Sequence, residues 1–441
     1  MVALPSSFET SRGHIASQTL PDTGPQLYTA PYFPLVGWLL AIAFFLCPAT
    51  TWLLIPGILS WSDVFLLAAV LVYIPGTVLR QEGLQIPTFA LFSVGLLVIA
   101  SMVSYTNHTN SLNPANCLKF VISLLVVPTS IMWCTRGKQD AIHRALWFWL
   151  IGTCLSALIA VLSKYGISVH GLQDESTVFG GRPSGLTYHA NVLSYTCALL
   201  IPVAIYLAVT ARTPLIRWIC IGAIGLLSDG ILVSGSRASI LAVMASGLVW
   251  LPNPFKTKVH RSELIILAGG ILVIAGIAFY ILLSDNPFED STNALSRLFG
   301  NLNESQRSND ARTRAARIAY DGFSGAPIFG QGFEHIRRAH NSSLQILHSG
   351  GIVSFGAVIL WWAGMGRNWW RLHLNAMKRM AANEVMMLKM FLSIALVEIV
   401  NGAFEPLLTD RNGYIAFGLM LGLLFSPKLV PTTAPARTSQ Y

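Results

Sequence analysis

The sequence predicts an all-α polytopic membrane protein of about twelve transmembrane helices. The first observation is composition: of 441 residues, 53% are hydrophobic and only 11% are charged. Soluble domains carry about 25% charged residues, so the composition excludes a compact soluble enzyme, a disordered chain and a coiled coil. The second observation is pattern, because the apolar residues fall into runs close to the length of about 20 residues that crosses a bilayer.

The predicted spans succeed one another along the chain with short polar loops between most of them. They cover residues 35–54, 62–79, 86–104, 118–134, 145–163, 190–209, 215–234, 238–251, 264–283, 343–363, 385–403 and 413–426. The ends of the chain are polar. We therefore expect a polar tail over 1–34, a single transmembrane domain over 35–426 and a second tail over 427–441.

The distribution of Lys and Arg predicts the orientation of the chain, because these residues mark short cytoplasmic loops. Basic residues occur in the loops 80–85, 135–144, 210–217, 252–263 and 364–389. The alternate loops 55–61 and 105–117 contain none, and the loop 404–412 contains only Arg411. Both termini are therefore expected in the cytoplasm. The charges are scattered among apolar spans, so nucleic acid is not expected as a partner.

One predicted external loop, residues 284–342, is much longer than the others and rich in Arg. Its basic residues are Arg297, Arg307, Arg312, Arg314, Arg317, Arg337 and Arg338, and it contains no Lys. The apolar spacing over 311–323 predicts that part of the loop is helical. The guanidinium group matches phosphate oxygens in pairs, so this loop is a candidate site for a lipid diphosphate. Contact with anionic lipid headgroups is the alternative interpretation.

Two further Arg residues lie near the predicted external ends of spans. Arg237 occurs in SGSRAS, a turn between two apolar runs, where a charge is costly unless it is paired or lines a wet space. Arg182 occurs in GGRPSGLTYHAN, where glycines permit a tight turn. We interpret Arg237 as a candidate for binding a ligand. For Arg182, the spacing alone indicates no more than an ordinary loop residue.

His340 is the candidate catalytic residue. It ends the Arg-rich loop where the next span begins, and an imidazole can take a proton from a hydroxyl group near neutral pH. Arg337 and Arg338 precede it and favour its unprotonated form. The nearby His335 and His348 match no zinc spacing, so no metal and no cofactor are expected.

A polar group also lies near the external end of the eleventh predicted span. It consists of Glu398, Asn401 and Glu405. Such residues either line a polar pathway through the membrane or form hydrogen bonds between neighbouring helices. The sequence alone leaves both interpretations open.

Four segments in order resemble the O-antigen ligase and polymerase superfamily of bacterial membrane glycosyltransferases. They are GRPSGLTYHANVLSY (181–195), SGSRASIL (234–241), GAPIFGQGF (325–333) and AHNSSLQILHSGGIVSFG (339–356). The long loop between spans nine and ten is also similar. The resemblance covers roughly residues 180–360. Ala190 stands where family members often have Pro.

The resemblance implies a catalytic domain over 35–426 in the bacterial cytoplasmic membrane, with its active site on the external face. Members transfer a glycan from a polyprenyl-diphosphate donor to an acceptor hydroxyl and need no metal or nucleotide. By this resemblance Arg182 and Arg237 bind the diphosphate, and His340 activates the acceptor hydroxyl. The remaining candidates are Arg314 and Arg338 for the diphosphate, and His189, Asn191 and Asn341 as possible substrate-binding residues.

Two other classes of protein stay open at this point. A transporter or lipid flippase would need polar or charged residues along several spans, and most of these spans have few. A membrane scaffold that binds anionic lipid through the Arg-rich loop would need no base at position 340. The sequence does not distinguish a ligase, which transfers one finished polymer, from a polymerase, nor does it name the sugar, the acceptor or the oligomeric state.

Overall fold

The computed structural model describes residues 32–51, 53–55, 59–79, 84–107, 114–136, 138–167, 182–251, 302–333, 340–405 and 410–424. Helices α1 (Tyr32–Leu46), α2 (Trp61–Leu79), α3 (Thr88–Asn107), α4 (Pro114–Val121), α5 (Val127–Thr135) and α6 (Gln139–Lys164) form the first half. The second half contains α7 (Ala190–Thr210), α8 (Pro214–Ser234), α9 (Arg237–Gly247), α12 (Leu302–Gly325), α13 (Ser342–Lys378), α14 (Ala382–Gly402) and α15 (Arg411–Leu423). A π-helical segment, η1 (Ile122–Val126), joins α4 to α5, and a 3-10 turn, η4 (Leu248–Trp250), follows α9.

The fold is that of an all-helical polytopic membrane protein. Within the described ranges, eight helices are long and apolar enough to cross a membrane. Three shorter apolar helices, Pro34–Leu46, Arg237–Trp250 and Asn412–Leu423, coincide with further predicted spans. The predicted span 264–283 lies outside the described residues, so the count of twelve stays a prediction.

Two predicted boundaries are wrong. The first span was expected to reach residue 54, but α1 ends at Leu46 because Pro48 disfavours helical backbone in the residue before it. Residues 53–55 instead form the strand β1 (Leu53–Ile55), which pairs antiparallel with β2 (Leu59–Ser60). The predicted loop 364–389 is also mostly helix, because α13 continues to Lys378 and α14 begins at Ala382.

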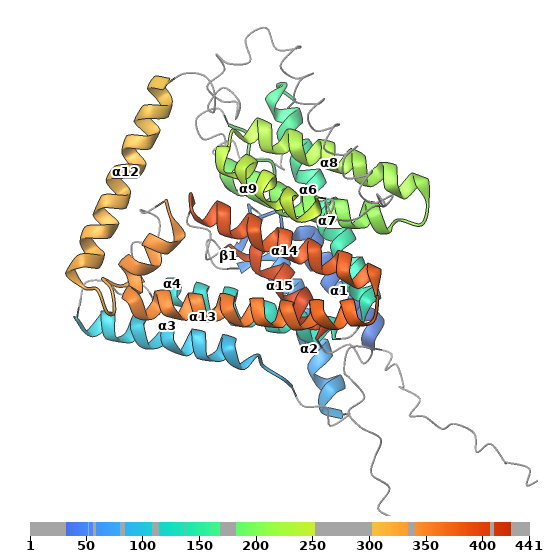
Figure 1. The fold of residues 1–441 in the computed structure, drawn as a ribbon, viewed down its shortest axis with the longest axis horizontal. Helices are drawn as coiled ribbons and strands as arrows, with labels where there is room; N and C mark the ends of the chain where they lie inside the picture. Colours follow the sequence, from blue (N-terminus) through green and yellow to red (C-terminus); the bar gives the residue numbers. More distant parts are fainter. Residues whose placement is uncertain are drawn as a thin grey trace, which may run out of the picture.

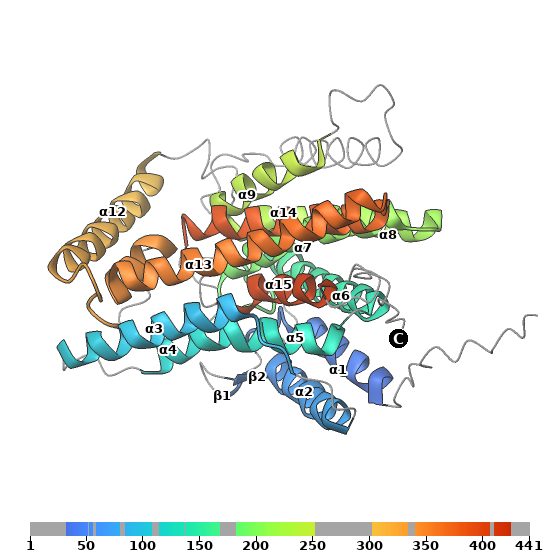
Figure 2. The same cartoon turned by 60° about the horizontal axis from the view of Figure 1, so that its bottom comes forward.

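The helices form one bundle in which segments distant in the sequence lie side by side. Figures 1 and 2 show α3 along α13 and α9 along α14, and both pairs are in contact. Helix α7 is central, because most of its residues are buried inside the protein. Helices α2 and α3 expose apolar side chains such as Leu71 and Phe92, which suits a surface that faces lipid. Most of the helices contribute to one large hydrophobic cluster in the interior, and Ala49, Ile159 and Leu186 form a second, small one.

The π-helical segment η1 is explained by the proline that follows it. Pro128 has no N–H group to donate to the carbonyl of Leu124, four residues earlier. Trp361 of α13, which is fully buried, donates its indole N–H to this carbonyl at 2.8 Å. The carbonyl of Leu124, which receives no hydrogen bond from Pro128, thereby joins η1 to α13.

Helix α12 confirms that the long loop is partly helical, including residues 311–323. Figure 1 shows α12 at one end of the bundle, running steeply across the direction of α3 and α13. It contacts α13 near the start of that helix, where the His348 imidazole lies 3.3 Å from the carbonyl oxygen of Ala319. The loop that was predicted to be external is therefore packed on the bundle through this helix.

A kink at Gly351 divides α13. Gly351 has φ 62° and ψ −161°, a conformation that residues other than glycine rarely adopt. The kink leaves carbonyl groups without helical partners, and two of them accept hydrogen bonds from the chain after α12: the N–H of Gln331 donates to His348 and that of Gly332 to Ser349. In return, the N–H of Ile352 donates to the carbonyl of Pro327. These bonds fix the start of α13 against the segment 327–332.

Replacing Gly351 with Ala is expected to destabilise the protein by about 1–3 kcal/mol, the usual cost of a residue in a disfavoured backbone conformation. A Cβ atom at this position would also lie 2.3 Å from the carbonyl oxygen of Ile328. The measurement is thermal unfolding in detergent. Gly356, in the same helix, has room for a Cβ atom, with no neighbouring atom within 4 Å of that position, so Gly356→Ala is the matched control and should not lower the melting temperature. Equal melting temperatures for the two variants would contradict the strain argument.

Candidate functional site

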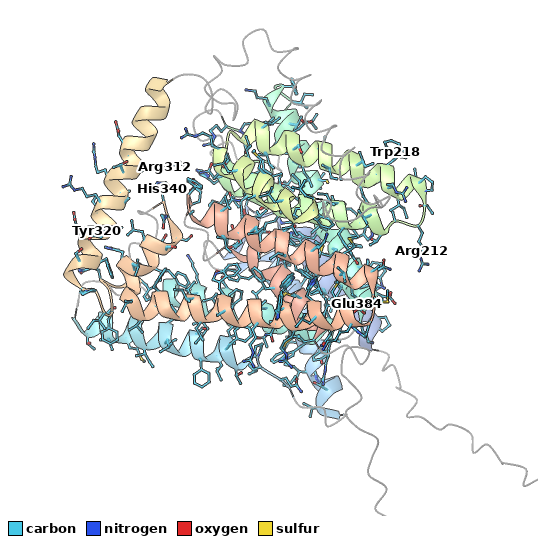
Figure 3. The ribbon with its side chains drawn as sticks, in the orientation of Figure 1. Arg212, Trp218, Arg312, Tyr320, His340 and Glu384 are labelled. Carbon is cyan, nitrogen blue, oxygen red and sulfur yellow. The ribbon has the colours of Figure 1, made fainter. Side chains whose placement is uncertain are left out.

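The predicted functional residues gather at one end of the bundle. Figure 3 shows Arg312 and His340 at the end where α12 lies, and Arg212 and Glu384 at the opposite end. Arg212 and Glu384 belong to the loops predicted to be cytoplasmic. The site therefore lies at the end opposite these two loops, which agrees with the prediction that it faces the outside.

Arg182 connects the end of α8 to the start of α7. Its Nε donates a hydrogen bond of 2.7 Å to the carbonyl of Ser234, the last residue of α8, and one terminal nitrogen donates at 2.7 Å to Oδ1 of Asn191. A cation at a helix C-terminus is favoured by the helix dipole. Gly235, with φ 70°, ends α8 and turns the chain towards α9. This geometry holds Arg182 close to the turn that carries Arg237.

Glu405 connects residues from three other parts of the chain. Its Oε1 accepts hydrogen bonds from Nδ2 of Asn191 at 2.7 Å and from a guanidinium nitrogen of Arg312 at 3.0 Å. Its Oε2 lies 3.6 Å from Nδ1 of His340. The Glu405 side chain is only 11% exposed. One carboxylate thus links the start of α7, helix α12 and the start of α13.

His340 precedes α13 in an uncommon backbone conformation. Its φ is 47°, in the left-handed region that His tolerates better than most residues. Asn341 caps α13, because its Oδ1 accepts from the N–H of Leu344 at 2.9 Å, and its Nδ2 donates to the carbonyl of Ala403. The side chain of His340 remains 43% exposed. His340 is thus held in place by its neighbour while its ring stays accessible.

His189 caps the start of α7. Its Nδ1 accepts a hydrogen bond from the backbone N–H of Asn191 at 3.1 Å. Burial lowers the pKa of the His189 imidazole, and the positive charge of Arg182 lowers this pKa further. A neutral ring suits its role as an acceptor. Both His189 and Asn191 therefore have structural contacts at the position where the sequence predicted substrate binding.

Arg237 is the first residue of α9. The side chain of Ser236, the residue before it, accepts from the hydroxyl of Ser239 at 3.5 Å but from no backbone N–H of the first turn. The positive charge of Arg312 acts on the Arg237 guanidinium, so the two lie within electrostatic range of each other. Ser239, in the first turn of α9, donates to Oδ1 of Asn401 at 3.0 Å and joins the helix to α14. The N-terminus of α9, with its partial positive charge, therefore carries one guanidinium group and has a second, that of Arg312, within electrostatic range.

The balance of charge around Glu405 favours an anionic ligand. In the part of the chain that the structure describes, Arg312 pairs with Glu405, and Arg182 is linked to Glu405 through Asn191. Arg237 lies within electrostatic range of Arg312, so three cations accompany one carboxylate. Helices α7, α9 and α13 add their N-terminal ends. Helix N-termini and Arg side chains are the usual ligands of phosphate groups.

The structure brings together most of the predicted site residues, and it adds two. Arg182, Asn191 and Asn341 belong to the hydrogen-bonded group around residues 403–405, with His189 next to Asn191. His340 lies 3.6 Å from the carboxylate of this group. Arg314 is exposed on α12, and Arg312 makes the ion pair with Glu405 in its place. Arg338 lies outside the described residues. From the sequence, Arg312 was only one of the Arg residues of the candidate loop, behind Arg314 and Arg338, and Glu405 was only a polar residue near the eleventh span.

The polar group of the eleventh predicted span forms hydrogen bonds between helices. Glu398 accepts from the hydroxyl of Tyr195 in α7, and Asn401 accepts from Ser239 in α9. Glu405 accepts from Asn191 of α7. The interpretation as helix-joining contacts is therefore supported by all three residues.

The fold and this site define a polytopic helical membrane protein with a cationic, phosphate-compatible site at one end of its bundle. Residues 218–359 match the family model described as O-antigen ligase, so the chain contains an O-antigen ligase family domain. No curated protein has a significant sequence match to the chain. The matched segment includes Arg237, Arg312 and His340, whereas Arg182 and Glu405 lie outside it. A domain of this family implies a glycosyltransferase-like enzyme of cell-envelope polysaccharide synthesis that acts on lipid-linked glycans.

Proposed function

We propose that this protein is a metal-independent inverting glycosyltransferase of the bacterial cytoplasmic membrane. It transfers a glycan from a polyprenyl-diphosphate donor to an acceptor hydroxyl on the external face. The observation that carries the proposal is the arrangement of Arg182, Arg312 and His340 around the single carboxylate of Glu405. The arrangement supports the proposal because guanidinium groups, which suit a diphosphate, lie near an imidazole, which can accept a proton.

The donor diphosphate lies against Arg182, Arg237 and Arg312 in this proposal. The bond that breaks joins the anomeric carbon of the glycan to a diphosphate oxygen, and negative charge grows on that oxygen as it leaves. Fixed cations and a helix N-terminus stabilise this charge without rearranging. The polyprenyl tail stays in the bilayer, so the donor enters from the side, between helices. Arg314 and Arg338 are further candidates along the donor.

His340 acts as the general base. The acceptor oxygen attacks the anomeric carbon while its proton passes to an imidazole nitrogen of His340. A single displacement of this kind inverts the configuration at the anomeric carbon. The products are the glycosylated acceptor, the free polyprenyl diphosphate and a protonated imidazole, which returns its proton to water. The exposed ring of His340 suits an acceptor that arrives from outside the bundle.

The test is mass analysis of the products made by the purified protein in liposomes. The protein is given a polyprenyl-diphosphate oligosaccharide and candidate acceptors, and EDTA is added to one arm. We expect a covalent glycan–acceptor product whose formation EDTA does not prevent. A single added glycan would indicate a ligase, and a ladder of repeat units would indicate a polymerase. Movement of the donor across the membrane without a covalent product would contradict the proposal and favour a flippase.

A further inference from the structure

We propose that Glu405 is the positioning residue of this site, which orients His340 for proton transfer and holds Arg312 beside the donor. The inference rests on the proposed function. Glu405 is not a catalytic residue in this scheme, because it acts through the two side chains that it contacts. Neither the family match nor the predicted site residues include it.

The backbone of Glu405 is fixed relative to His340 by two contacts. The hydroxyl of Ser342 donates a hydrogen bond of 2.8 Å to the carbonyl of Glu405, and Asn341 donates one of 2.9 Å to the carbonyl of Ala403. Both donors follow His340 directly in the chain. The segment after α14 and the start of α13 therefore move together, and the carboxylate keeps its place beside the imidazole.

The two oxygens of the carboxylate serve different halves of the reaction. Oε1 accepts from Asn191 and Arg312, and Asn191 in turn accepts from Arg182, so this oxygen belongs to the donor side. Oε2 faces Nδ1 of His340, which belongs to the acceptor side. A carboxylate at one ring nitrogen leaves the other nitrogen to take the proton of the acceptor. Its negative charge then stabilises the imidazolium ion that forms.

The burial of Glu405 increases the strength of these contacts. The residue is 8% exposed, so water screens its charge less than it would at the surface. The ion pair between Arg379 and Glu384 offers a comparison, because it joins the same residue types at 2.6 Å at the opposite end of the bundle. Figure 3 shows Glu384 far from Arg312 and His340.

The test compares Glu405→Gln with Glu384→Gln in the transfer assay. The first substitution keeps the shape of the side chain and an oxygen acceptor for Asn191 but removes the charge. We expect E405Q to lower kcat at least about tenfold with little change in the KM for the acceptor, as for other residues that orient a reacting group. E384Q should leave both constants unchanged. Glu405→Asp, which restores the charge, should recover part of kcat.

A double variant separates positioning from a general effect on structure. If Glu405 acts mainly through His340, adding E405Q to His340→Ala should reduce the remaining activity much less than it reduces that of the unmodified protein. Equal fold losses in the two backgrounds would overturn the assignment. So would wild-type kcat in E405Q. These outcomes require an active parent protein, so absence of product from the unmodified protein would instead contradict the proposed function itself.

Discussion

Replacing His340 with Ala is expected to lower kcat by about 10²- to 10⁴-fold, the usual contribution of a general base. The imidazole is the proton acceptor in the proposed reaction, and Ala offers none. The His340 side chain is 43% exposed, so its loss leaves no internal cavity and the fold should persist. The measurement is the initial rate of glycan transfer in liposomes, together with the melting temperature of the variant in detergent.

His373 provides the matched control for this prediction. It lies near the other end of α13, where its ring stacks on Trp369 with centroids 5.0 Å apart. His373→Gln should retain the wild-type rate of transfer. Full activity of His340→Ala would contradict the role of His340 as base, whereas loss of activity in both variants would point to a general sensitivity of α13.

The helices could be predicted because membrane spans depend on composition and length, which are local properties. The extension of α13 to Lys378 was missed because the polar residues beyond 363 suggested a loop. In the structure, Met365, Leu372 and Ala376 are buried along one face, with spacings of seven and four that match the helical period. The helical spacing of apolar residues is present in this segment, but the polar residues between them lower its mean hydropathy.

Residues of the candidate site could be predicted from the sequence only where they occur in short, recognisable segments. Arg182, Arg237 and His340 occur in short segments that resemble a known family. Glu405 has no such segment, because its partners Asn191 and Arg312 lie 214 and 93 residues away in the chain. Contacts of this range depend on how helices pack, which a single sequence does not show.

The choice between Arg312 and Arg314 illustrates the same limit. Successive residues of a helix are rotated by about 100°, so residues two apart point in nearly opposite directions. One of the two therefore faces the bundle and the other faces away. Only the packing of α12, through buried Ala319 against His348, shows that the face of Arg312 is the inner one.

Replacing Arg237 with Lys is expected to weaken use of the donor, with kcat/KM for the donor falling by about 10- to 100-fold. The guanidinium group can donate two parallel hydrogen bonds to a phosphate, whereas an ammonium group acts as a point charge. A hydrogen bond to a charged group contributes about 1.5–3 kcal/mol, which corresponds to a change of this size. The measurement is the rate of transfer as a function of donor concentration at fixed acceptor.

Arg212→Lys is the control, because Arg212 is exposed in the turn between α7 and α8 at the opposite end of the bundle. Inorganic pyrophosphate separates loss of diphosphate binding from loss of other contacts. It should inhibit the wild-type protein and Arg212→Lys competitively with the donor, and it should inhibit Arg237→Lys more weakly. If Arg237→Lys changed the KM for the acceptor and left inhibition by pyrophosphate unchanged, Arg237 would contact the acceptor, and the diphosphate site would have to be built on Arg182 and Arg312 without it.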